Sequence, residues 1–206
     1  MRSFKINGII VKRVNYKDAD RILTVFTKEQ GKISIKAAGI RRIPSRRSPH
    51  VELLNHSLLT LYRGNAFPVL TEAQTFDSFS SLKQDLSKIG FAYHICELID
   101  GLCPEGQENV AVFELLKNTL TRLSQPVILE RSANGAIESL SEDFIVAYQP
   151  LQDDIVSIIH EFEVELLNLL GYWNNNRAVL NWDTHAFIEN IIERKLKSRN
   201  IFAKLQ

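Results

Sequence analysis

Nine basic side chains in the first quarter of the chain could neutralise the phosphates of a nucleic acid. Four of them lie in the short stretch 41–47, which contains no acidic residue. Lysine and arginine that contact phosphates release counterions, and the resulting affinity is independent of base sequence and falls as salt rises. The candidate DNA-binding residues are Lys12, Arg13, Arg21, Lys32, Lys36, Arg41, Arg42, Arg46 and Arg47.

The net charge of +1 conceals an uneven distribution of charge along the chain. Residues 1–50 contain thirteen Lys or Arg and three Asp or Glu, a net charge of +10, and residues 51–206 carry the compensating −9. Basic segments without balancing acids are typical of nucleic-acid surfaces, although a run of like charges is also found on solvated faces. The asymmetry predicts that the N-terminal part binds nucleic acid and that the acidic remainder has another role.

Residue patterns typical of catalysis are absent from the sequence. It contains no glycine-rich phosphate-binding motif and no Gly-x-Ser-x-Gly motif, and no two of its five histidines have the spacing of metal ligands. Asp18 and Asp20 could hold a nuclease metal, but a turn acid that pairs with Arg21 or a backbone N–H is the favoured interpretation. Glu161 and Glu165 are interpreted as a solvated helix face. We expect a binding protein without catalytic residues, cofactor or metal.

The basic residues are expected on a small β-barrel. Residues 21–27 and 32–38 alternate between apolar and polar positions around Gly31, which can adopt a positive φ, and this pattern predicts a hairpin. Its outward face would carry Lys32, Ser34 and Lys36. Further strands are expected over residues 4–13, 51–62 and 68–76. Five strands without an intervening helix predict either an OB-fold, which binds oligonucleotides, or an SH3-like barrel.

Few aromatic side chains in this part of the chain could stack on bases. The candidates are Tyr16, Phe26 and Tyr62, and Phe26 is favoured as a core residue. Weak stacking combined with strong phosphate contact predicts little sequence preference and tolerance of both single and double strands.

The pattern becomes helical near residue 80, which predicts a barrel domain over 1–78 and an α-helical domain over 79–206. A capping box at residues 81–84 would begin a first helix that ends near Leu102, with Leu82, Leu86, Ile89, Tyr93 and Cys96 on one stripe. Asn109 is expected to cap a second helix that ends before Pro126. Later helices are expected over residues 142–148, 155–170 and 183–197, and Gly171 is expected at the C′ position of the third long helix.

Cys96 and Cys103 both fall in helical territory and are interpreted as core thiols of a protein from a reducing cytoplasm. No apolar run approaches the roughly 20 residues that a membrane-spanning helix needs. The first residues lead directly into a predicted strand, and they lack the apolar region of a secretory signal.

Several N-terminal segments, taken in order, resemble the OB-fold of the RecO family of bacterial recombination mediators. They are Gly-Ile-Ile-Val-Lys-Arg, Asp-Ala-Asp-Arg-Ile-Leu-Thr-Val-Phe-Thr, Gln-Gly-Lys-Ile-Ser, Gly-Ile-Arg-Arg and Leu-Tyr-Arg-Gly. The resemblance is strongest over residues 8–42 and returns near the end of the chain. It implies a cytoplasmic, nucleoid-associated protein that binds DNA, anneals complementary strands, engages the tail of single-strand-binding protein, and works with RecR to load RecA.

The chain departs from the family pattern at two places. Many family members carry a four-cysteine zinc module after a Leu-Gly-Tyr, but here Leu170-Gly171-Tyr172 is followed by Trp173-Asn174 without a Cys-x-x-Cys. The family often has a basic residue where this chain has Ala38, and Lys36 is a possible substitute. Because family members bind the acidic tail of single-strand-binding protein in their helical domain, the candidate site for that tail is Arg194, Lys195, Lys197 and Arg199. The alternative for this patch is a basic helix end that is favoured by the macrodipole.

Two other functions remain open from the residues. The basic barrel could instead bind structured RNA or an acidic protein as a non-catalytic adaptor, which a competition between RNA and single-stranded DNA would reveal. A divalent-metal nuclease at Asp18 and Asp20 is the third alternative, which intact DNA after incubation with magnesium or manganese would exclude.

Overall fold

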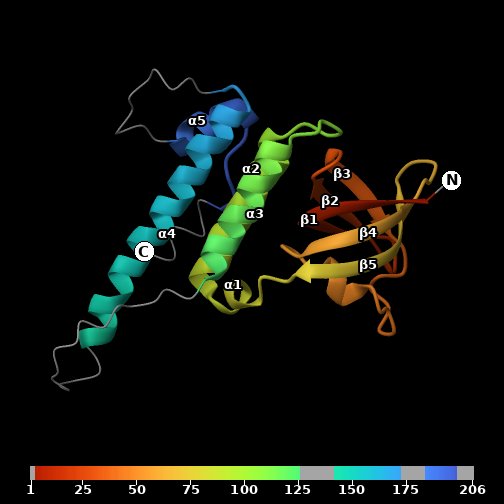
Figure 1. Ribbon diagram of the computed structural model, residues 1–206, viewed down its shortest axis with the longest axis horizontal. Coiled ribbons are helices and arrows are strands. Elements are labelled where there is room, and N and C mark those ends of the chain that lie inside the picture. Colours follow the sequence, from red (N-terminus) through yellow and green to blue (C-terminus); the bar gives the residue numbers. More distant parts are fainter. Residues whose placement is uncertain (1–2, 126–141, 173–183, 199–206) are drawn as a thin grey trace.

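The computed structural model describes residues 3–125, 142–172 and 184–198, which form a β-barrel followed by a group of helices (Figure 1). The strands are β1 (Ser3–Tyr16), β2 (Asp20–Thr27), β3 (Gly31–Ala37), β4 (His56–Tyr62) and β5 (Val69–Asp77). They close in the order β1-β2-β3-β5-β4, with all neighbours antiparallel except β3 and β5. The predicted five-stranded OB-fold and the predicted helical domain are both confirmed.

Strand β1 connects the two halves because its side chains face two different cores. Ile6 and Ile10 point into the barrel interior, whereas Ile9 and Val11 belong to the core formed by the helices. The register of β1 against β2 shifts between Ile10 and Lys12. Such an irregularity increases the local twist of the strand, and here it lies where β1 passes from its pairing with β4 to its exposed end.

The fourth strand is shorter than the sequence pattern predicted. The expected strand over 51–62 begins only at His56, and it is preceded by a 3-10 helix, η1 (Ser48–Val51). Leu54 has a φ of 70°, which no strand residue adopts, and its N–H donates to the Ile10 carbonyl. Asn55 Nδ2 donates to the Pro49 carbonyl at 2.8 Å, which holds the turn before the strand.

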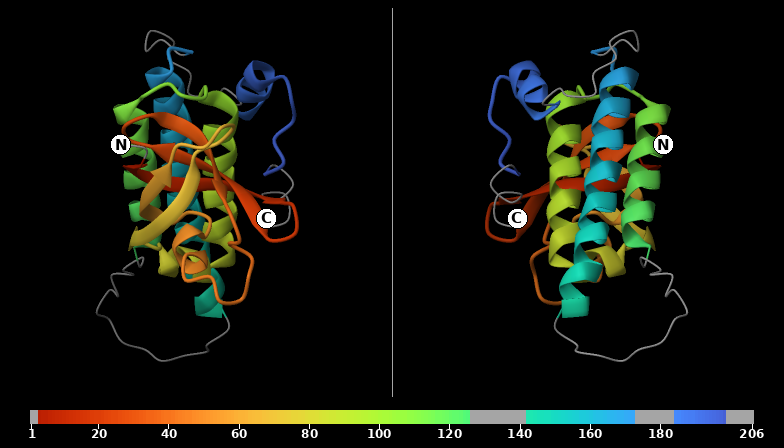
Figure 2. Two further views of the ribbon diagram at one scale, coloured as in Figure 1. Left: turned by 90° about the vertical axis from the view of Figure 1, so that its right-hand side faces the viewer. Right: turned by 90° about the vertical axis from the view of Figure 1, so that its left-hand side faces the viewer.

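The helices are α1 (Ser80–Gln84), α2 (Leu86–Leu102), α3 (Val110–Ser124), α4 (Glu142–Leu169) and α5 (Thr184–Ile192). Figure 2 shows α4 on the side of α2 and α3 that faces away from the barrel, with α5 beside the end of α2. Side chains of α2, α3, α4 and α5 share a core with part of the barrel. No helix among these described segments is long and apolar enough to cross a membrane.

The first predicted helix is two helices, because the capping residue is not the one that the sequence pattern indicated. Asp85 has an extended backbone conformation, which interrupts the helix after α1. Its side chain accepts hydrogen bonds from the backbone N–H groups of Ser87 and Lys88 and so caps the start of α2. The predicted capping box makes no side-chain cap, and Phe79 is the N-cap of α1. The predicted stripe is also wrong in part, since Leu86 and Tyr93 are exposed.

Other helical predictions have mixed outcomes. The Asn109 side chain accepts from the Val112 N–H at 3.0 Å, and α3 ends at Ser124, as predicted. Gly171 has the expected positive φ of 78°. The short helix expected over residues 142–148 is instead the start of α4, which runs continuously past Pro150. One proline removes only one backbone donor, so a long helix can continue through it.

The two cysteines are core thiols, as predicted. Both Cys96 and Cys103 are free and buried. Burial raises the pKa of Cys96 to about 12 and that of Cys103 to about 11, so neither is a reactive thiolate at neutral pH. The predicted division into residues 1–78 and 79–206 stays a prediction, since the barrel strands β1 and β2 contribute to the helical core.

Gly31 is expected to be indispensable to the contact between the β2–β3 turn and the segment before α3. It has a φ of 64°, and an added Cβ would lie 1.8 Å from the Gln107 carbonyl oxygen. Gly31→Ala should therefore lower the free energy of unfolding by about 2 kcal/mol or more. Gly106→Ala is the control, because Gly106 has a similar φ of 70° but open space around it. Backbone strain alone should lower the free energy of unfolding of this control by roughly 1 kcal/mol. Equal losses in urea denaturation would contradict the proposed clash.

Candidate nucleic-acid interface

Two of the nine candidate phosphate ligands face the helical domain. Lys12 pairs with the Asp100 carboxylate at 2.7 Å, and Lys32 Nζ donates to the Asp100 backbone carbonyl at 2.5 Å. Lys32 is only 8% exposed, so its predicted place on an outward face is wrong. The end of α2 covers this side chain, and alternation within a strand could not reveal a neighbouring domain.

Three further candidates are engaged within the barrel. Arg13 pairs with Glu52 at 2.5 Å. Arg47 donates to the Ala38 backbone carbonyl at 2.8 Å and also to that of Leu70. These two hydrogen bonds attach the loop after β3 to the barrel wall. Arg21 Nε donates to Asn15 Oδ1 at 3.2 Å across the β1–β2 hairpin.

Asp20 organises the junction between the β1–β2 hairpin and the loop after β3. One carboxylate oxygen accepts from the Gly39 N–H at 2.7 Å, and the other pairs with Lys36 at 3.0 Å. The hydrogen bond from Gly39 and then the one from Lys36 lower the pKa of Asp20. These partners agree with the interpretation of Asp20 as a turn acid, and they occupy the oxygens that a nuclease metal would need.

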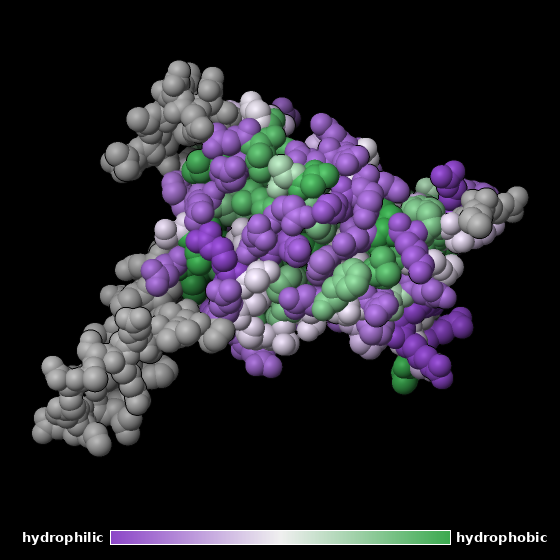
Figure 3. All heavy atoms as spheres, in the orientation of Figure 1, coloured by the Kyte–Doolittle hydropathy of each residue, from purple (hydrophilic) through white to green (hydrophobic). Residues whose placement is uncertain are grey.

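Three arginines of the loop after β3 are available to a ligand. Arg41, Arg42 and Arg46 are exposed, and their side chains form no ion pair with any side chain that the structure describes, in 3–125, 154–172 or 184–198. The Arg41 N–H donates to the Ala19 carbonyl at 3.0 Å, which places the loop against the β1–β2 turn. The space-filling view shows strongly hydrophilic side chains gathered at this end of the barrel, at the lower right of the molecule (Figure 3).

Tyr16 offers an aromatic face on the β1–β2 hairpin, against which this loop rests. It is 39% exposed, and the ammonium groups of Lys17 and Lys36 lie 5.5 Å and 5.7 Å from the centre of its ring. Phe26 is fully buried, which agrees with the core interpretation and removes it as a stacking platform. Figure 2 shows the β1–β2 hairpin extending to one side of the barrel, beyond the helices.

These residues form one surface, which we call the basic ridge. It connects the tip of the β1–β2 hairpin to the loop after β3 through Asp20, and its members are Tyr16, Lys17, Lys36, Arg41, Arg42 and Arg46. Its cations could contact phosphates while the Tyr16 ring stacks on a base. Lys17 is the member that the sequence reasoning missed. In the sequence, only its position next to Tyr16, in the turn that contains Asp18 and Asp20, indicated that Lys17 could belong to this surface.

Two of the four candidate peptide-binding residues line a separate cavity of about 240 Å³ between β1, α2 and the segment after α5. Arg194 and Lys197 line it together with Lys12, and Val11, Leu53 and Tyr93 supply apolar surface. Glu97 and Asp100 also line it, but Glu97 accepts from the backbone of Lys197 and Ser198, and Asp100 pairs with Lys12. Lys195 is exposed outside this lining, and Arg199 is outside the described residues.

Comparisons with known proteins point to one family. The family model for Recombination protein O N terminal matches residues 1–79, and the model for Recombination protein O C terminal matches residues 83–135. Proteins named DNA repair protein RecO are similar to this chain. The one from Symbiobacterium thermophilum is 27% identical over 92% of this chain and 65% of its own length. Those from Acetivibrio thermocellus and Dehalococcoides mccartyi are 31% and 39% identical, over 84% and 60% of this chain. The chain spans less than two thirds of each relative, since it covers 59% and 50% of the latter two.

Proposed function

The chain belongs to the RecO family of DNA repair proteins, and on this basis we propose that it is a non-catalytic recombination mediator. In this proposal it binds single- and double-stranded DNA on the basic ridge and anneals complementary strands. It also engages single-strand-binding protein and, with RecR, promotes the loading of RecA.

The proposal is carried by a set of unpaired arginines in a loop that rests against the hairpin bearing the exposed Tyr16 ring. Arg41, Arg42 and Arg46 have no acidic partner among the described residues, whereas Lys12, Arg13 and Lys36 already have one. Unpaired cations at an exposed loop gain most from a polyanion, because no existing ion pair has to be broken. Guanidinium groups also suit phosphates, which they contact through two parallel hydrogen bonds.

The same surface suits annealing better than base reading. Phosphate contacts position a strand without reporting its sequence, and the ridge offers one stacking ring, Tyr16. Screening of phosphate charge lowers the repulsion between two complementary strands, so they can approach and pair. Base pairing between the strands then supplies the specificity that the protein lacks.

A salt-titrated annealing assay tests this function. Complementary oligonucleotides are coated with single-strand-binding protein, and the rate of duplex formation is followed with and without this chain. We expect faster annealing that is lost as salt rises, because the contacts are to phosphates. DNA binding without annealing would refute the mediator function, and preference for structured RNA over single-stranded DNA in competition would favour the adaptor alternative.

We propose that the cavity at Arg194 and Lys197 receives the acidic, apolar-ended tail of single-strand-binding protein. The cationic groups of the two side chains suit carboxylates, and Val11, Leu53 and Tyr93 give apolar side chains a surface to cover. Asp100 pairs with Lys12, and Glu97 interacts with Arg194, so the three cations and two acids of the lining leave a net charge of +1 for an acidic peptide.

Charge reversal at this cavity should weaken binding of the tail peptide. Fluorescence anisotropy with a labelled peptide is expected to show about 10-fold weaker binding for the double variant Arg194→Glu, Lys197→Glu. Lys195→Glu is the control, since Lys195 lies in the same segment but outside the cavity lining. If the control weakens binding as much as the double variant does, the attraction is general and the cavity is not the site.

A further inference from the structure

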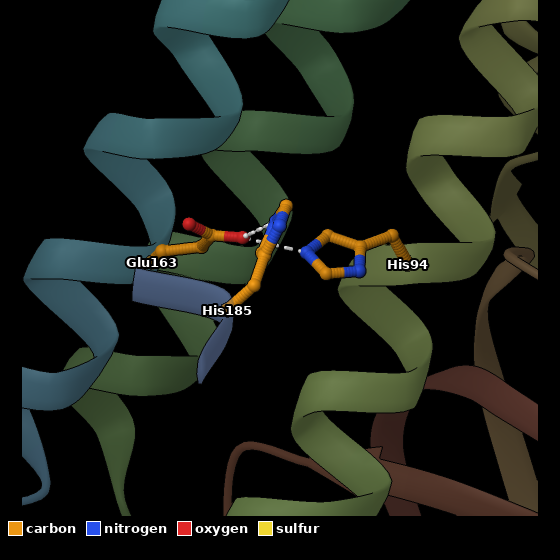
Figure 4. A group of neighbouring side chains, drawn as sticks. All are labelled: His94, Glu163 and His185. Atoms are coloured by element: carbon orange, nitrogen blue, oxygen red, sulfur yellow. Dashed lines mark hydrogen bonds and ion pairs between the residues drawn. The ribbon is translucent and has the colours of Figure 1, made fainter. Parts of the chain in front are cut away.

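Three side chains from three helices converge in the helical domain, far from the basic ridge along the chain (Figure 4). His94 of α2 and His185 of α5 both direct Nε2 at the same oxygen of Glu163 on α4, at 2.7 Å and 2.9 Å. One ligand atom from each residue lies within 4.8 Å of the others. The His94 and Glu163 side chains are buried, whereas the His185 side chain is 33% exposed.

The hydrogen bonds around His94 direct its Nε2 at the Glu163 carboxylate. The Ser198 hydroxyl lies 2.8 Å from the Glu97 carboxylate and therefore donates to it. Ser198 Oγ is then an acceptor for His94, 2.7 Å away, and Nδ1 must carry a proton. A neutral His94 consequently presents the lone pair of Nε2 to a carboxylate oxygen. A metal cation placed between this nitrogen and the Glu163 carboxylate would be bound by both groups.

The Glu163 carboxylate has partners at both of its oxygens. One of its oxygens receives Nε2 of both His94 and His185, at 2.7 Å and 2.9 Å. The second oxygen of Glu163 accepts from Thr184 Oγ1, the first residue of α5. The carboxylate is therefore oriented from both sides.

The surrounding contacts are those that orient metal ligands. A histidine that binds a metal through one nitrogen usually donates its other N–H to an oxygen that is itself fixed, and a ligating carboxylate is usually hydrogen-bonded too. Here His94 Nδ1 is held by Ser198, which Glu97 anchors, and Thr184 holds Glu163. The rings of His94 and His185 meet edge to face, with centroids 5.2 Å apart, so their nitrogens converge without stacking.

We propose that His94, Glu163 and His185 bind one Zn²⁺ ion. Two imidazole nitrogens and one carboxylate oxygen form a recognised zinc ligand set, with bond lengths of about 2.0–2.2 Å and a fourth position for water. The partial exposure of His185 gives the ion and that water an entry path. Binding requires the present contacts to open to roughly 3.3 Å, the separation of neighbouring ligands around tetrahedral zinc. Movement of the short helix α5 can open the His185 contact, and a small rotation of the Glu163 side chain can open the contact with His94 on α2.

The proposed ion would fasten α5 to the rest of the helical domain. Within the described residues, α5 is nine residues long and buries few side chains, among them Thr184 and Ile188. Isolated helices of this length are unstable in water, so attachment to α2 and α4 matters for its position. The segment after α5 carries Arg194 and Lys197 at the cavity, and a fastened α5 would position them for a ligand.

Metal binding by the full chain tests the proposal. The protein is stripped with a chelator and titrated with Zn²⁺ alone, and bound metal is counted after dialysis. We expect one Zn²⁺ per chain for the native protein and none for Glu163→Gln or His185→Ala. Substitution with Co²⁺ should give visible absorption in the native protein and not in these variants, which reports ligation independently of stability.

His160→Ala is the matched control, because His160 is an exposed histidine one turn before Glu163 on the same helix. It should retain the full equivalent of zinc. Ser198→Ala removes no ligand, so it keeps the test valid if a ligand variant fails to fold, and it should weaken zinc binding about 10-fold. The proposal is overturned if the native chain binds no zinc, or if Glu163→Gln and His185→Ala bind it as the native chain does. The three side chains would then be held together by hydrogen bonds alone.

Discussion

Reversal of Arg41, Arg42 and Arg46 to glutamate is expected to weaken the binding of single-stranded DNA by at least about 100-fold at moderate salt. These three arginines are exposed and have no ionic partner among the described residues. Each reversal removes one phosphate contact and adds a repulsive charge. The slope of log affinity against log salt should therefore fall by about three, which a fluorescence titration at several salt concentrations measures.

Arg47 is left unchanged in this variant for a structural reason. Its guanidinium binds the backbone carbonyls of Ala38 and Leu70, so Arg47→Glu would release the loop and confuse a folding effect with a binding effect. The matched control reverses three bases of the helical domain, Lys117, Arg122 and Lys195, which changes the net charge equally. If the control loses as much affinity as the loop variant, total charge determines binding and the basic ridge has no special role.

Phe26→Ala is expected to lower the free energy of unfolding by about 3–5 kcal/mol. Phe26 lies on β2 and is fully buried in the core that β1 and β2 share with the helices. Truncation leaves a cavity at the junction of the two halves, which cannot close without moving the barrel against α2 and α3. Urea denaturation followed by circular dichroism measures the loss.

Tyr16→Ala is compared with Phe26→Ala, because Tyr16 is expected to contribute to DNA binding and Phe26 to stability. Tyr16 is exposed at the basic ridge, so its removal should leave the free energy of unfolding almost unchanged. It should instead weaken binding of single-stranded DNA by about 1–3 kcal/mol through lost stacking. Unchanged DNA affinity would remove Tyr16 from the interface, and unchanged stability in Phe26→Ala would contradict its place in the shared core.

Local patterns predicted most elements because local chemistry determines them. The alternation around Gly31 indicated the β2–β3 hairpin, and Asn109 and Gly171 marked the ends of helices through their own backbone preferences. The predictions failed where the sequence offered two candidates for the same feature, such as a helix cap or a buried helix face. Asp85 was a better cap than the box at residues 81–84, and the stripe with Leu86 and Tyr93 was not the buried one.

Long-range contacts were beyond such patterns. The end of α2 binds Lys12 and Lys32 through Asp100, so two of nine candidate phosphate ligands face the helical domain. The alternation of residues in a strand does not indicate which helix packs against that strand in the folded protein. The same limit hid the cluster of His94, Glu163 and His185, whose members lie on α2, α4 and α5 and have no motif spacing.

The amino-acid sequence by itself determined that a basic N-terminal barrel precedes an acidic helical domain, and its motifs indicated the RecO family, which the comparisons confirm. Composition and short-range periodicity carry that information because they arise from neighbouring residues. The tertiary structure alone decided which cations stay free, since an arginine is available to phosphate only when no distant acid or carbonyl reaches it. It also decided that two histidines and a glutamate meet, because only helix packing brings together side chains that the chain keeps far apart.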